Sequence, residues 1–390
     1  MKIAGVICEY NPFHRGHAYH LAETRARTGC DYVVACMTGS FVQRGEAACL
    51  SKWTRAEMAL RSGADAVFEL PALYAIRTAD VFARGGVAIL SGIGADVLSF
   101  GSETADMRLL ESIAELRENE PECVSNAIRR GLSEGKSHAR AQGEAIAEYL
   151  NLNPELLDSP NLILACEYLR AIHALGAAIQ PIAIRRAGDY HSGETGAGYA
   201  SATAVRRLLQ MGEMKRAAAE LPETAQFALR EWKGMHAPDD LLLHCLRSMT
   251  ESEIAALPDV SEGLENRVKR AAGEAFDRES LIEKLKCKRY TRARLNRLCA
   301  HAMLGLTRAL AERHPTPEYA RLIGMREDAR PLLRELKSRA QIPIVSSPRA
   351  LVNGEVFALE ARATDLRALC MNAPEQRTQN AEWTAKFVRV

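Results

Sequence analysis

Residues 9–23 read EYNPFHRGHAYHLAE, a stretch that places three histidines, an arginine and a proline between two regular patterns. The apolar run KIAGVIC (2–8) before it predicts a buried strand. The run GHAYHLAETRARTG (16–29) after it has helical spacing and ends at Gly29, a typical residue after a helix. In α/β proteins such a strand-to-helix loop lies at the carboxyl edge of the sheet, where ligands bind.

Four more apolar runs predict further strands of the same sheet, at 31–37, 65–71, 96–103 and 179–186. Helical stretches separate them, and this alternation is typical of a parallel sheet covered on both faces. The predicted fold class is therefore α/β, with a Rossmann-like parallel sheet in residues 1–215. From Pro222 the alternation stops, and residues 216–345 predict a mainly helical, basic domain with one short strand at 337–348. Residues 346–390 form a C-terminal segment to which the pattern assigns no structure.

Bulk composition narrows the function classes. The formal net charge is +2, so a nucleic-acid signal must come from the distribution of charge along the chain. Ten scattered cysteines include no CxxC pair, which argues against a zinc site or a disulfide framework and favours reduced thiols in the cytoplasm. No metal ligand set is predicted. No apolar run has the length of a transmembrane helix, so we expect no membrane partner.

The loop His14-Arg15-Gly16-His17 is the first candidate site. A helix N-terminus offers free N–H groups and partial positive charge to a phosphate, and Gly16 permits close approach to the backbone. Two histidines at this spacing can donate to charge that develops on a phosphate under attack, so we predict catalytic roles for His14 and His17. The alternative is a pair of surface or metal-binding histidines, and the position at a strand-to-helix loop favours the phosphate.

The stretch TGSFVQRGEAACLSKWTRAEMAL (38–60) follows the second predicted strand and lies at the same edge of the sheet. Lys52 and Arg55 stand three residues apart at a helix start and are expected to face one way. As catalytic cations they would hold the β- and γ-phosphates and stabilise departing pyrophosphate. The alternative is a solvated basic helix face.

Several later residues are weaker candidates for the same site. Ser201, Thr203 and Arg206 give a second helix N-terminus with hydroxyls and a cation, which suits phosphate. Arg185 and Arg186 end a predicted strand and would reach the cleft. Gly101 in SFGSE could admit a base or ribose, or simply form a turn, and Asn161 could instead cap a helix.

The stretch KLKCKRYTRARLNRLCAHAMLGLTR (284–308) is strongly basic and holds no acidic residue. Its leucine spacing buries one helix face and leaves a basic face outward. Such a face is typical of binding to an RNA backbone, with a tyrosine available for base stacking. The alternative is a solvated helix that balances acidic neighbours. The predicted RNA-binding residues are Lys286, Lys288, Arg289, Tyr290, Arg292, Arg294 and Arg297.

Taken together, these motifs resemble a known family. His-x-Gly-His after the first strand and Ser-x-Thr-x-x-Arg at 201–206 are similar to the adenylyltransferase superfamily, whose domain is a nucleotidyltransferase fold. More narrowly, EYNPFHRGHAYHL, GSFVQRGE, KWTRAEMALRSGADAVFELP, SPNLILACEYLRA, SATAVR and KCKRYTRARLNRL resemble, in order, the tRNA(Met) cytidine acetate ligase family. The resemblance spans residues 1–350.

The resemblance implies an ATP-dependent ligase that activates acetate as acetyl-adenylate. The acetyl group would then pass to N4 of the wobble cytidine of elongator tRNA(Met), with acetate, ATP and this tRNA as partners. Mg²⁺ usually accompanies such a triphosphate, although no ligand cluster here demands it. The implied ATP site comprises Ile7, Cys8, Glu9, Tyr10, Asn11, Pro12, Phe13, His14, Arg15, Gly16, His17, Ala18, Tyr19, His20, Gly101, Asn161, Arg185 and Arg186.

Two other functions stay open at this point. One is an adenylyltransferase that joins AMP to a small phosphorylated metabolite, which gives no reason for the basic stretch at 284–308. The other is an RNA-binding protein with a degenerate nucleotide site, which gives no reason for the two motif histidines.

Overall fold

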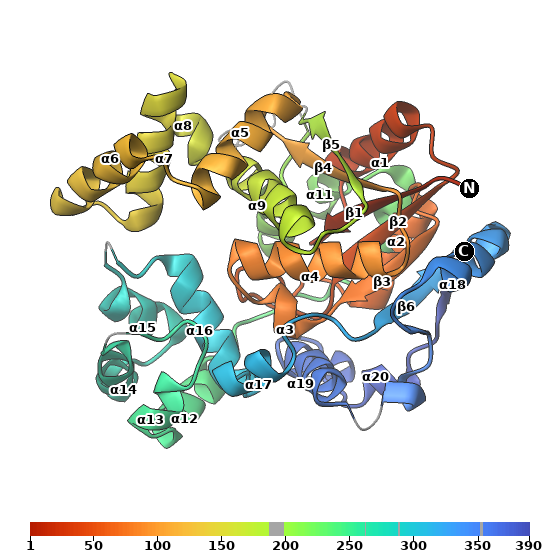
Figure 1. Ribbon diagram of the computed structural model, residues 1–390. Helices are drawn as coiled ribbons and strands as arrows, with labels where there is room; N and C mark the ends of the chain where they lie inside the picture. Colours follow the sequence, from red (N-terminus) through yellow and green to blue (C-terminus); the bar gives the residue numbers. More distant parts are fainter. Residues whose placement is uncertain (187–198, 262, 288, 352–353) are drawn as a thin grey trace.

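A computed structural model describes residues 1–186, 199–261, 263–287, 289–351 and 354–390. These residues form an eight-stranded sheet at the centre of the molecule (Figure 1). Along the sheet the strands are β5 (Gln180–Arg185), β4 (Val97–Ser102), β1 (Ile3–Cys8), β2 (Tyr32–Thr38), β3 (Ala66–Leu70), β6 (Ala320–Met325) and β7 (Ile344–Val345), while β8 (Val388–Arg389) also pairs with β6.

The first five strands confirm the predicted parallel sheet. β1 pairs in parallel with both β2 and β4, and β3 and β5 extend the sheet at either side. The fold is thus Rossmann-like, but the sheet is mixed, since β6 runs antiparallel to β3. β6 and β7 lie within the range expected for the helical domain, yet both belong to this sheet.

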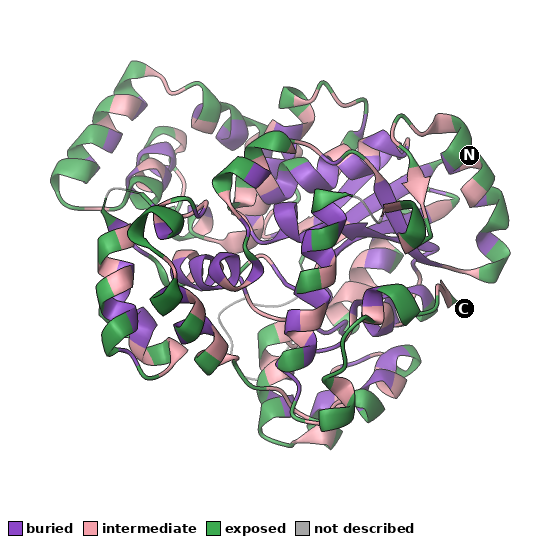
Figure 2. Ribbon diagram, turned by 90° about the horizontal axis from the view of Figure 1, so that it is seen from below, coloured by how far each residue is buried: buried purple, intermediate pink, exposed green. Residues whose placement is uncertain are grey.

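Alternate side chains of the strands enter two different cores. Ile3 and Val34 pack on one face, Ala4 and Val33 on the other. The first face is covered by α3 (Ala72–Ala75), α4 (Ala79–Gly92), α5 (Met107–Glu118), α9 (Pro160–Ala174), α18 (Arg330–Arg339) and α19 (Glu355–Leu369). The second is covered by α1 (Arg15–Thr28), α2 (Lys52–Arg61), α10 (Ala202–Gln210), α11 (Met214–Ala219) and η1 (Glu223–Glu231). Figure 2 shows buried strands between helices whose outer faces are exposed.

Two helical lobes project from the same side of the sheet (Figure 1). One comprises α6 (Glu122–Ser133), α7 (His138–Leu150) and α8 (Pro154–Leu157). The other has its own core, with buried residues between 242 and 302, and comprises α12 (Asp239–Ser248), α13 (Glu251–Ala255), α14 (Leu264–Glu274), α15 (Arg278–Leu285) and α16 (Arg292–Leu304). This second lobe is narrower than the expected domain 216–345, because α11 and η1 pack on the sheet.

The C-terminal segment returns to the sheet domain. After α17 (Arg308–Arg313) and β6 come η2 (Glu327–Ala329), α18, β7, η3 (Pro348–Leu351), α19, η4 (Pro374–Gln376), α20 (Ala381–Thr384) and β8. The strand expected at 337–348 is only β7, and it pairs with β6 in the sheet rather than lying beside the helices. Among the described residues, no helix is both long and apolar enough to cross a membrane. The ten cysteines are all free thiols.

Candidate functional site

A cavity of about 300 Å³ opens at the carboxyl ends of β1, β4 and β5 and at the N-termini of α1 and α10. The structure brings together here most of the residues predicted for the nucleotide site. They are Ile7, Cys8, Glu9, Tyr10, Asn11, His14, Gly16, His17, Tyr19, His20, Gly101, Asn161, Arg185, Arg186, Ser201, Thr203 and Arg206.

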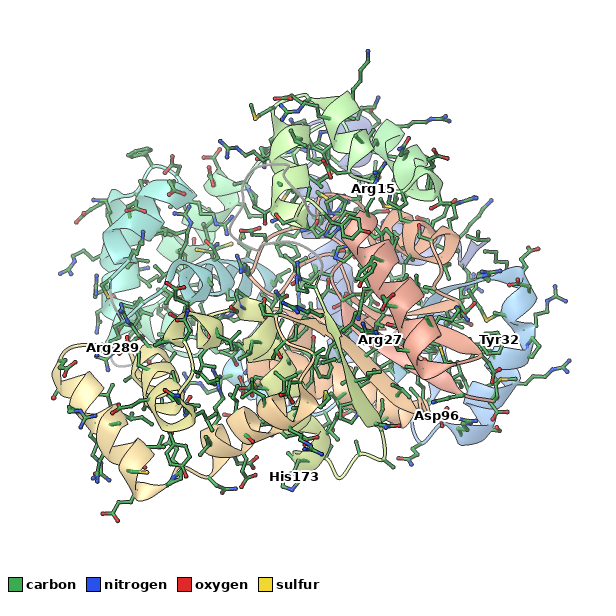
Figure 3. The ribbon with its side chains drawn as sticks, turned by 90° about the horizontal axis from the view of Figure 1, so that it is seen from above. Arg15, Arg27, Tyr32, Asp96, His173 and Arg289 are labelled. Carbon is green, nitrogen blue, oxygen red and sulfur yellow. The ribbon has the colours of Figure 1, made fainter. Side chains whose placement is uncertain are left out.

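Four predicted residues of the continuous stretch do not line the cavity. Pro12 and Phe13 are buried, and the Phe13 ring packs 4.7 Å from the ring of Tyr10 and 5.5 Å from that of His17. Arg15 lies exposed in the first turn of α1 (Figure 3), where its backbone N–H donates to Glu220 O at 3.0 Å. Ala18 lies on the next turn. A continuous stretch cannot place every residue in one cavity, because a helix turns its side chains around its axis.

His14 and His17 cap α1 reciprocally. The Nδ1 atom of His14 accepts from Gly16 N at 3.1 Å, and the Nδ1 atom of His17 accepts from His14 N at 3.2 Å. The two rings stack, with centroids 3.6 Å apart. Because both Nδ1 atoms accept, the hydrogen of each neutral imidazole must lie on Nε2. Each histidine therefore has an Nε2–H donor that the cap does not use.

The three histidines of the cavity are neutral at physiological pH. Burial lowers the pKa of His14 to about 3 and that of His20 to about 4, and the nearby Arg186 charge acts in the same direction. Burial also holds the pKa of His17 well below its usual value, with His14 and Arg186 adding to the effect. Neutral imidazoles can donate from Nε2 to a phosphate oxygen without a buried charge.

Gly16 packs closely against this cap. A Cβ atom at this position would lie 3.0 Å from His14 Cε1 and 3.1 Å from His14 Nδ1. A side chain here would therefore press on the imidazole whose Nδ1 caps the helix. The glycine of the His-x-Gly-His pattern thus keeps the histidine in place as well as leaving room for a ligand.

The second helix N-terminus is also formed as predicted. Ser201 caps α10 by accepting from Ala204 N at 3.2 Å. Arg206 donates to Asn11 O at 2.7 Å and to Thr203 Oγ1 at 3.2 Å, which holds its guanidinium at the cavity. The N-termini of α1 and α10 therefore bring backbone N–H groups and a cation to one cavity.

Asn161 joins the ends of β4 and β5 instead of capping a helix. Its Nδ2 atom donates to Glu103 Oε1 at 2.7 Å, and its Oδ1 atom accepts from Arg186 Nη1 at 2.9 Å. The cap of α9 is Ser159. Gly101 lies beside Arg186, since an added Cβ would be 3.4 Å from Arg186 Cγ.

The structure corrects the expected positions of Lys52 and Arg55. Both are fully buried at the start of α2, and neither lines the cavity. Arg55 donates to the backbone oxygens of Glu9, Leu50 and Gly39, the first at 2.5 Å and the second at 3.2 Å. Arg55 therefore joins the segments that follow β1 and β2 through their backbone oxygens, without lining the cavity itself. The solvated alternative also fails for these two side chains, because both are enclosed by protein.

Lys52 belongs to a buried charge cluster, which comprises Lys52, Glu69, Arg321, Glu360 and Glu382. Its Nζ contacts Glu69 and Glu382 and lies 3.6 Å from Glu360. The three carboxylates are close enough to hold a metal ion, but the Lys52 ammonium already lies among them. Burial and the Glu69 charge raise the pKa of Glu360 well above its usual value, so it is neutral. Two carboxylates then balance two cations.

Sequence reasoning missed several lining residues. Phe82, Phe100, Leu164 and Tyr168 form an apolar wall, but in the sequence they read as ordinary core positions. Glu46 was also missed. It lies on the 41–47 hairpin with Gln43 and Arg44, whose loop the sequence does place at this edge of the sheet, and a bridge between Phe41 and Ala47 joins the ends of the hairpin. Their polar run after β2 was the available signal.

Fewer side chains of the basic stretch 284–308 are available to contact RNA than its composition indicates. Tyr290 is 4% exposed, packs in the core of the lobe and lies 5.1 Å from the Arg294 guanidinium, so its ring is not available for base stacking. Arg297 pairs with Asp259 at 2.6 Å. Arg292 pairs with Glu279 at 2.7 Å and remains about half exposed. Acidic residues outside the stretch therefore balance part of its charge, as the alternative expected.

Two other predicted RNA-binding residues, Lys286 and Arg289, lie in or beside the same lobe. Lys286 is half exposed and lies 4.0 Å from Glu283. Arg289 lies on the opposite side of Figure 3 from Arg27 and Tyr32 of the sheet domain. Lys288 lies outside the described residues.

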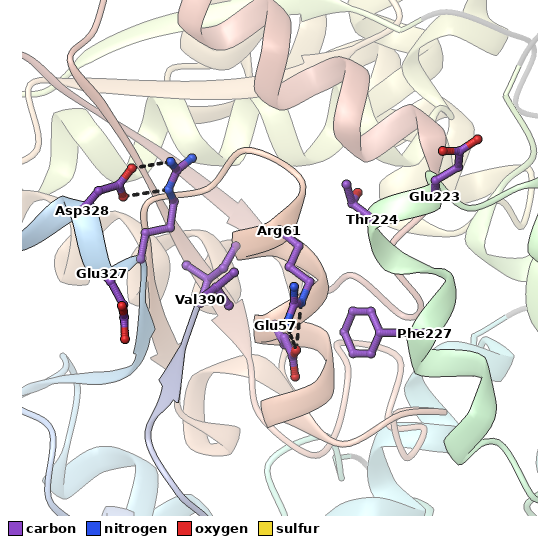
Figure 4. A pocket seen from close by; sticks show the side chains of 10 residues that line it. Glu57, Arg61, Glu223, Thr224, Phe227, Glu327, Asp328 and Val390 are labelled. Carbon is purple, nitrogen blue, oxygen red and sulfur yellow. Dashed lines mark hydrogen bonds and ion pairs between the residues drawn. The ribbon is translucent and has the colours of Figure 1, made fainter.

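A larger cavity of about 790 Å³ lies between α2, η1 and the C-terminus (Figure 4). Its two arginines, Arg61 and Arg326, are paired with Glu57 at 2.8 Å and Asp328 at 2.5 Å. Glu223 and Glu327 also line it. A surplus of carboxylates makes this cavity unfavourable for a triphosphate.

Comparisons with known proteins agree with this geometry. A family model described as HIGH Nucleotidyl Transferase matches residues 1–382. A tRNA(Met) cytidine acetate ligase from Acetivibrio thermocellus is 34% identical over 414 residues and covers 100% of both chains. Another from Thermoanaerobacter sp. is 35% identical over 384 residues, or 95% of each chain.

Solved structures give the same result. The crystal structure of apo Thermotoga maritima TmcAL has a TM-score of 0.90 at 30% identity and covers 100% of both chains. The structure of the same protein bound with alpha-thio ATP has a TM-score of 0.88 at 30% identity, covering 100% of this chain and 99% of that one. The chain belongs to the tRNA(Met) cytidine acetate ligase family of HIGH nucleotidyl transferases.

Proposed function

We propose that this chain is an ATP-dependent ligase that converts acetate to acetyl-adenylate and acetylates N4 of the wobble cytidine of elongator tRNA(Met). The observation that carries the proposal is the capped His14–His17 pair, which presents Nε2–H donors in a cavity shared with Arg206. Its relatives bear the name of this activity, and one solved relative is bound with alpha-thio ATP. Its free cysteines support a reducing cytoplasm as its location.

In the first step an acetate oxygen attacks the α-phosphorus and pyrophosphate leaves. The Nε2–H groups of His14 and His17 would donate to the phosphate oxygens as negative charge builds up. The N-terminus of α10 and Arg206 would stabilise the departing pyrophosphate. No protein nucleophile is needed, because acetate itself forms the new bond.

In the second step the N4 amine attacks the acetyl carbon and AMP leaves. The cytosine must be unstacked from the anticodon to reach the cavity. We propose that the lobe of α12–α16 holds the anticodon stem through Lys286, Arg289 and Arg292. The positions of Arg294 and Arg297 favour a supporting role within the lobe instead.

Mg²⁺ would be carried by the triphosphate. The described carboxylates that are close enough to form a cation site belong to the buried charge cluster, away from the cavity, and enclose Lys52. We therefore assign no step to a protein-bound metal and propose that the nucleotide phosphates hold the ion.

Exchange of labelled pyrophosphate into ATP, measured across a panel of small carboxylates with and without bulk tRNA, tests the proposal. We expect exchange that depends on acetate, followed by N4-acetylcytidine in tRNA. If ATP binds but none of the acids supports exchange, the result would favour an adenylyltransferase of a phosphorylated metabolite. A failure to bind ATP would favour an RNA-binding protein.

A further inference from the structure

The second step of the proposed reaction needs a group that the first step does not use. The N4 amine of cytosine is a weak nucleophile, since its lone pair is delocalised into the ring. On acetylation it must also lose a proton. A carboxylate that accepts a hydrogen bond from N4–H meets both needs, and carboxylates are standard partners of this amine.

The described residues that line the cavity offer two carboxylates, Glu9 and Glu46. The Glu9 Oε1 atom already accepts from Gln43 N at 2.8 Å, and burial raises the pKa of this carboxyl. Glu46 lies in a more open position. Its side chain is 38% exposed at the rim, and its nearest ion-pair contact is to Arg206 at 3.9 Å.

The 41–47 hairpin holds Glu46 between the nucleotide cavity and the basic lobe. Val42 N donates to Glu46 O at 3.0 Å, and Gly45 N donates to Val42 O at 2.9 Å. Gly45 has φ +74°, and a Cβ there would lie 2.6 Å from Asn296 O in α16. The hairpin tip therefore rests directly on the backbone of α16.

The charges near Glu46 also link the two regions. Arg206 belongs to α10 at the cavity, while Arg292 belongs to the first turn of α16. The pKa of Arg292 is raised mainly by its hydrogen bond to Glu279, with smaller effects from Glu283 and Glu46. Glu46 is thus the rim carboxylate at the place where a base held by the lobe would enter the cavity.

We propose that the Glu46 carboxylate accepts a hydrogen bond from the exocyclic amine of the acceptor cytosine and takes its proton during acetyl transfer. The N4–C bond forms, the bond from the acetyl carbon to the phosphate oxygen breaks, and its electron pair leaves with AMP. The proton goes to a Glu46 oxygen. A uracil would present a carbonyl oxygen at the same position, which the carboxylate repels. This assignment rests on the proposed function and extends it to the acceptor.

The test separates the two steps. The enzyme is first loaded with ATP, acetate and pyrophosphatase, and tRNA is then added for a single turnover. For Glu46→Gln we expect acetate-dependent exchange within about twofold of the wild type and transfer slowed by about 100-fold, as for loss of a general base. Glu46→Asp should recover part of the transfer rate. The transfer rate of Glu46→Gln should rise with pH, because solvent base must replace the carboxylate.

Glu57→Gln is the matched control. Glu57 is 32% exposed and also pairs with an arginine, Arg61, but it lines the other cavity. Its variant should keep both rates. Unchanged transfer in Glu46→Gln would overturn the assignment, and so would a parallel loss of exchange and transfer, which would place Glu46 with the nucleotide. Absence of exchange in the wild type would instead overturn the proposed function, and this assignment with it.

Discussion

Among single residues, His14 and His17 combine an observed structural role with the chemical role proposed for them. Their Nδ1 atoms cap α1, so their remaining hydrogens lie on Nε2, and burial keeps both rings neutral. A neutral donor suits a site that must admit a triphosphate and then stabilise extra charge at the α-phosphorus. The spacing of the motif thus follows from the geometry of a helix cap.

The two tasks of His14 can be separated by mutation. Asparagine places an acceptor close to the position of Nδ1, so His14→Asn should keep the cap and change the free energy of unfolding by less than about 1 kcal/mol. It removes the Nε2–H donor, so acetate-dependent exchange should fall by about 100- to 1,000-fold. Urea unfolding and exchange assays measure the two effects. Near-normal exchange in this variant would show that His14 serves only as the cap.

Among the elements, α16 contributes both to the lobe and to its junction with the sheet domain. Its Arg292 is about half exposed, whereas Arg297 forms a largely buried pair with Asp259. From the composition of the stretch, RNA binding is predicted for both arginines. Their surroundings favour RNA contact for the first and support of the lobe for the second.

Paired variants of α16 test this difference. Arg292→Gln should weaken tRNA binding and lower the slope of log affinity against log salt by about one, because one phosphate contact is lost. Arg297→Gln should leave that slope unchanged and cost about 3 kcal/mol in unfolding free energy, because Asp259 loses its partner. Binding titrations over a range of KCl concentrations and urea unfolding provide the data. Equal changes of slope in both variants would contradict this assignment.

His301 anchors α16 to the sheet domain. Its Nε2 lies 2.7 Å from Ile76 O, and burial lowers its pKa to about 4 despite the opposing effect of Asp259. The unfolded chain binds a proton at this histidine below about pH 6.5, whereas the folded chain does so only below about pH 4. Its contribution to stability is therefore complete above pH 6.5 and is lost as the pH falls toward 4.

Glutamine can donate to Ile76 O without titrating, so His301→Gln isolates this effect. Between pH 6.5 and pH 4 the wild type should lose up to about 3 kcal/mol more unfolding free energy than the variant. Urea unfolding at a series of pH values measures the difference. Parallel curves for the two proteins would show that His301 does not titrate in this range.

At the scale of the whole molecule, the buried charge cluster connects distant parts of the chain. It joins Lys52 of α2 and Glu69 of β3 to Arg321 of β6, Glu360 of α19 and Glu382 of α20. Burial opposes ionisation of Glu69, but Lys52 and Arg321 outweigh it and hold its pKa at about 2. The cluster therefore fastens the C-terminal segment to the sheet behind the cavity.

Removal of Lys52 should affect stability more than chemistry. Lys52→Met leaves buried carboxylates with a single cation, so we expect a loss of about 3–5 kcal/mol in unfolding free energy. The remaining folded enzyme should retain acetate-dependent exchange, since Lys52 does not line the cavity. Unfolding curves and exchange per folded molecule distinguish the outcomes. A variant with normal stability and no exchange would instead support the sequence-based prediction that Lys52 binds the nucleotide phosphates.

Local pattern was sufficient for the parallel strands and for the loop between β1 and α1. The periodicity that predicts strands and helices depends only on neighbours in sequence. Because parallel strands end at the same edge of the sheet, the cavity and most of its lining were also predictable. The antiparallel β6, the burial of Lys52 and Tyr290, and the packing of the 41–47 hairpin against α16 were not predictable. These depend on contacts between distant segments, such as that of Lys52 with Glu382, which are 330 residues apart, and no local pattern records which carboxylate meets which cation. The sequence by itself determined the five parallel strands and the loop between β1 and α1, whereas the tertiary structure alone decided which charges face the cavity and which hold the fold together.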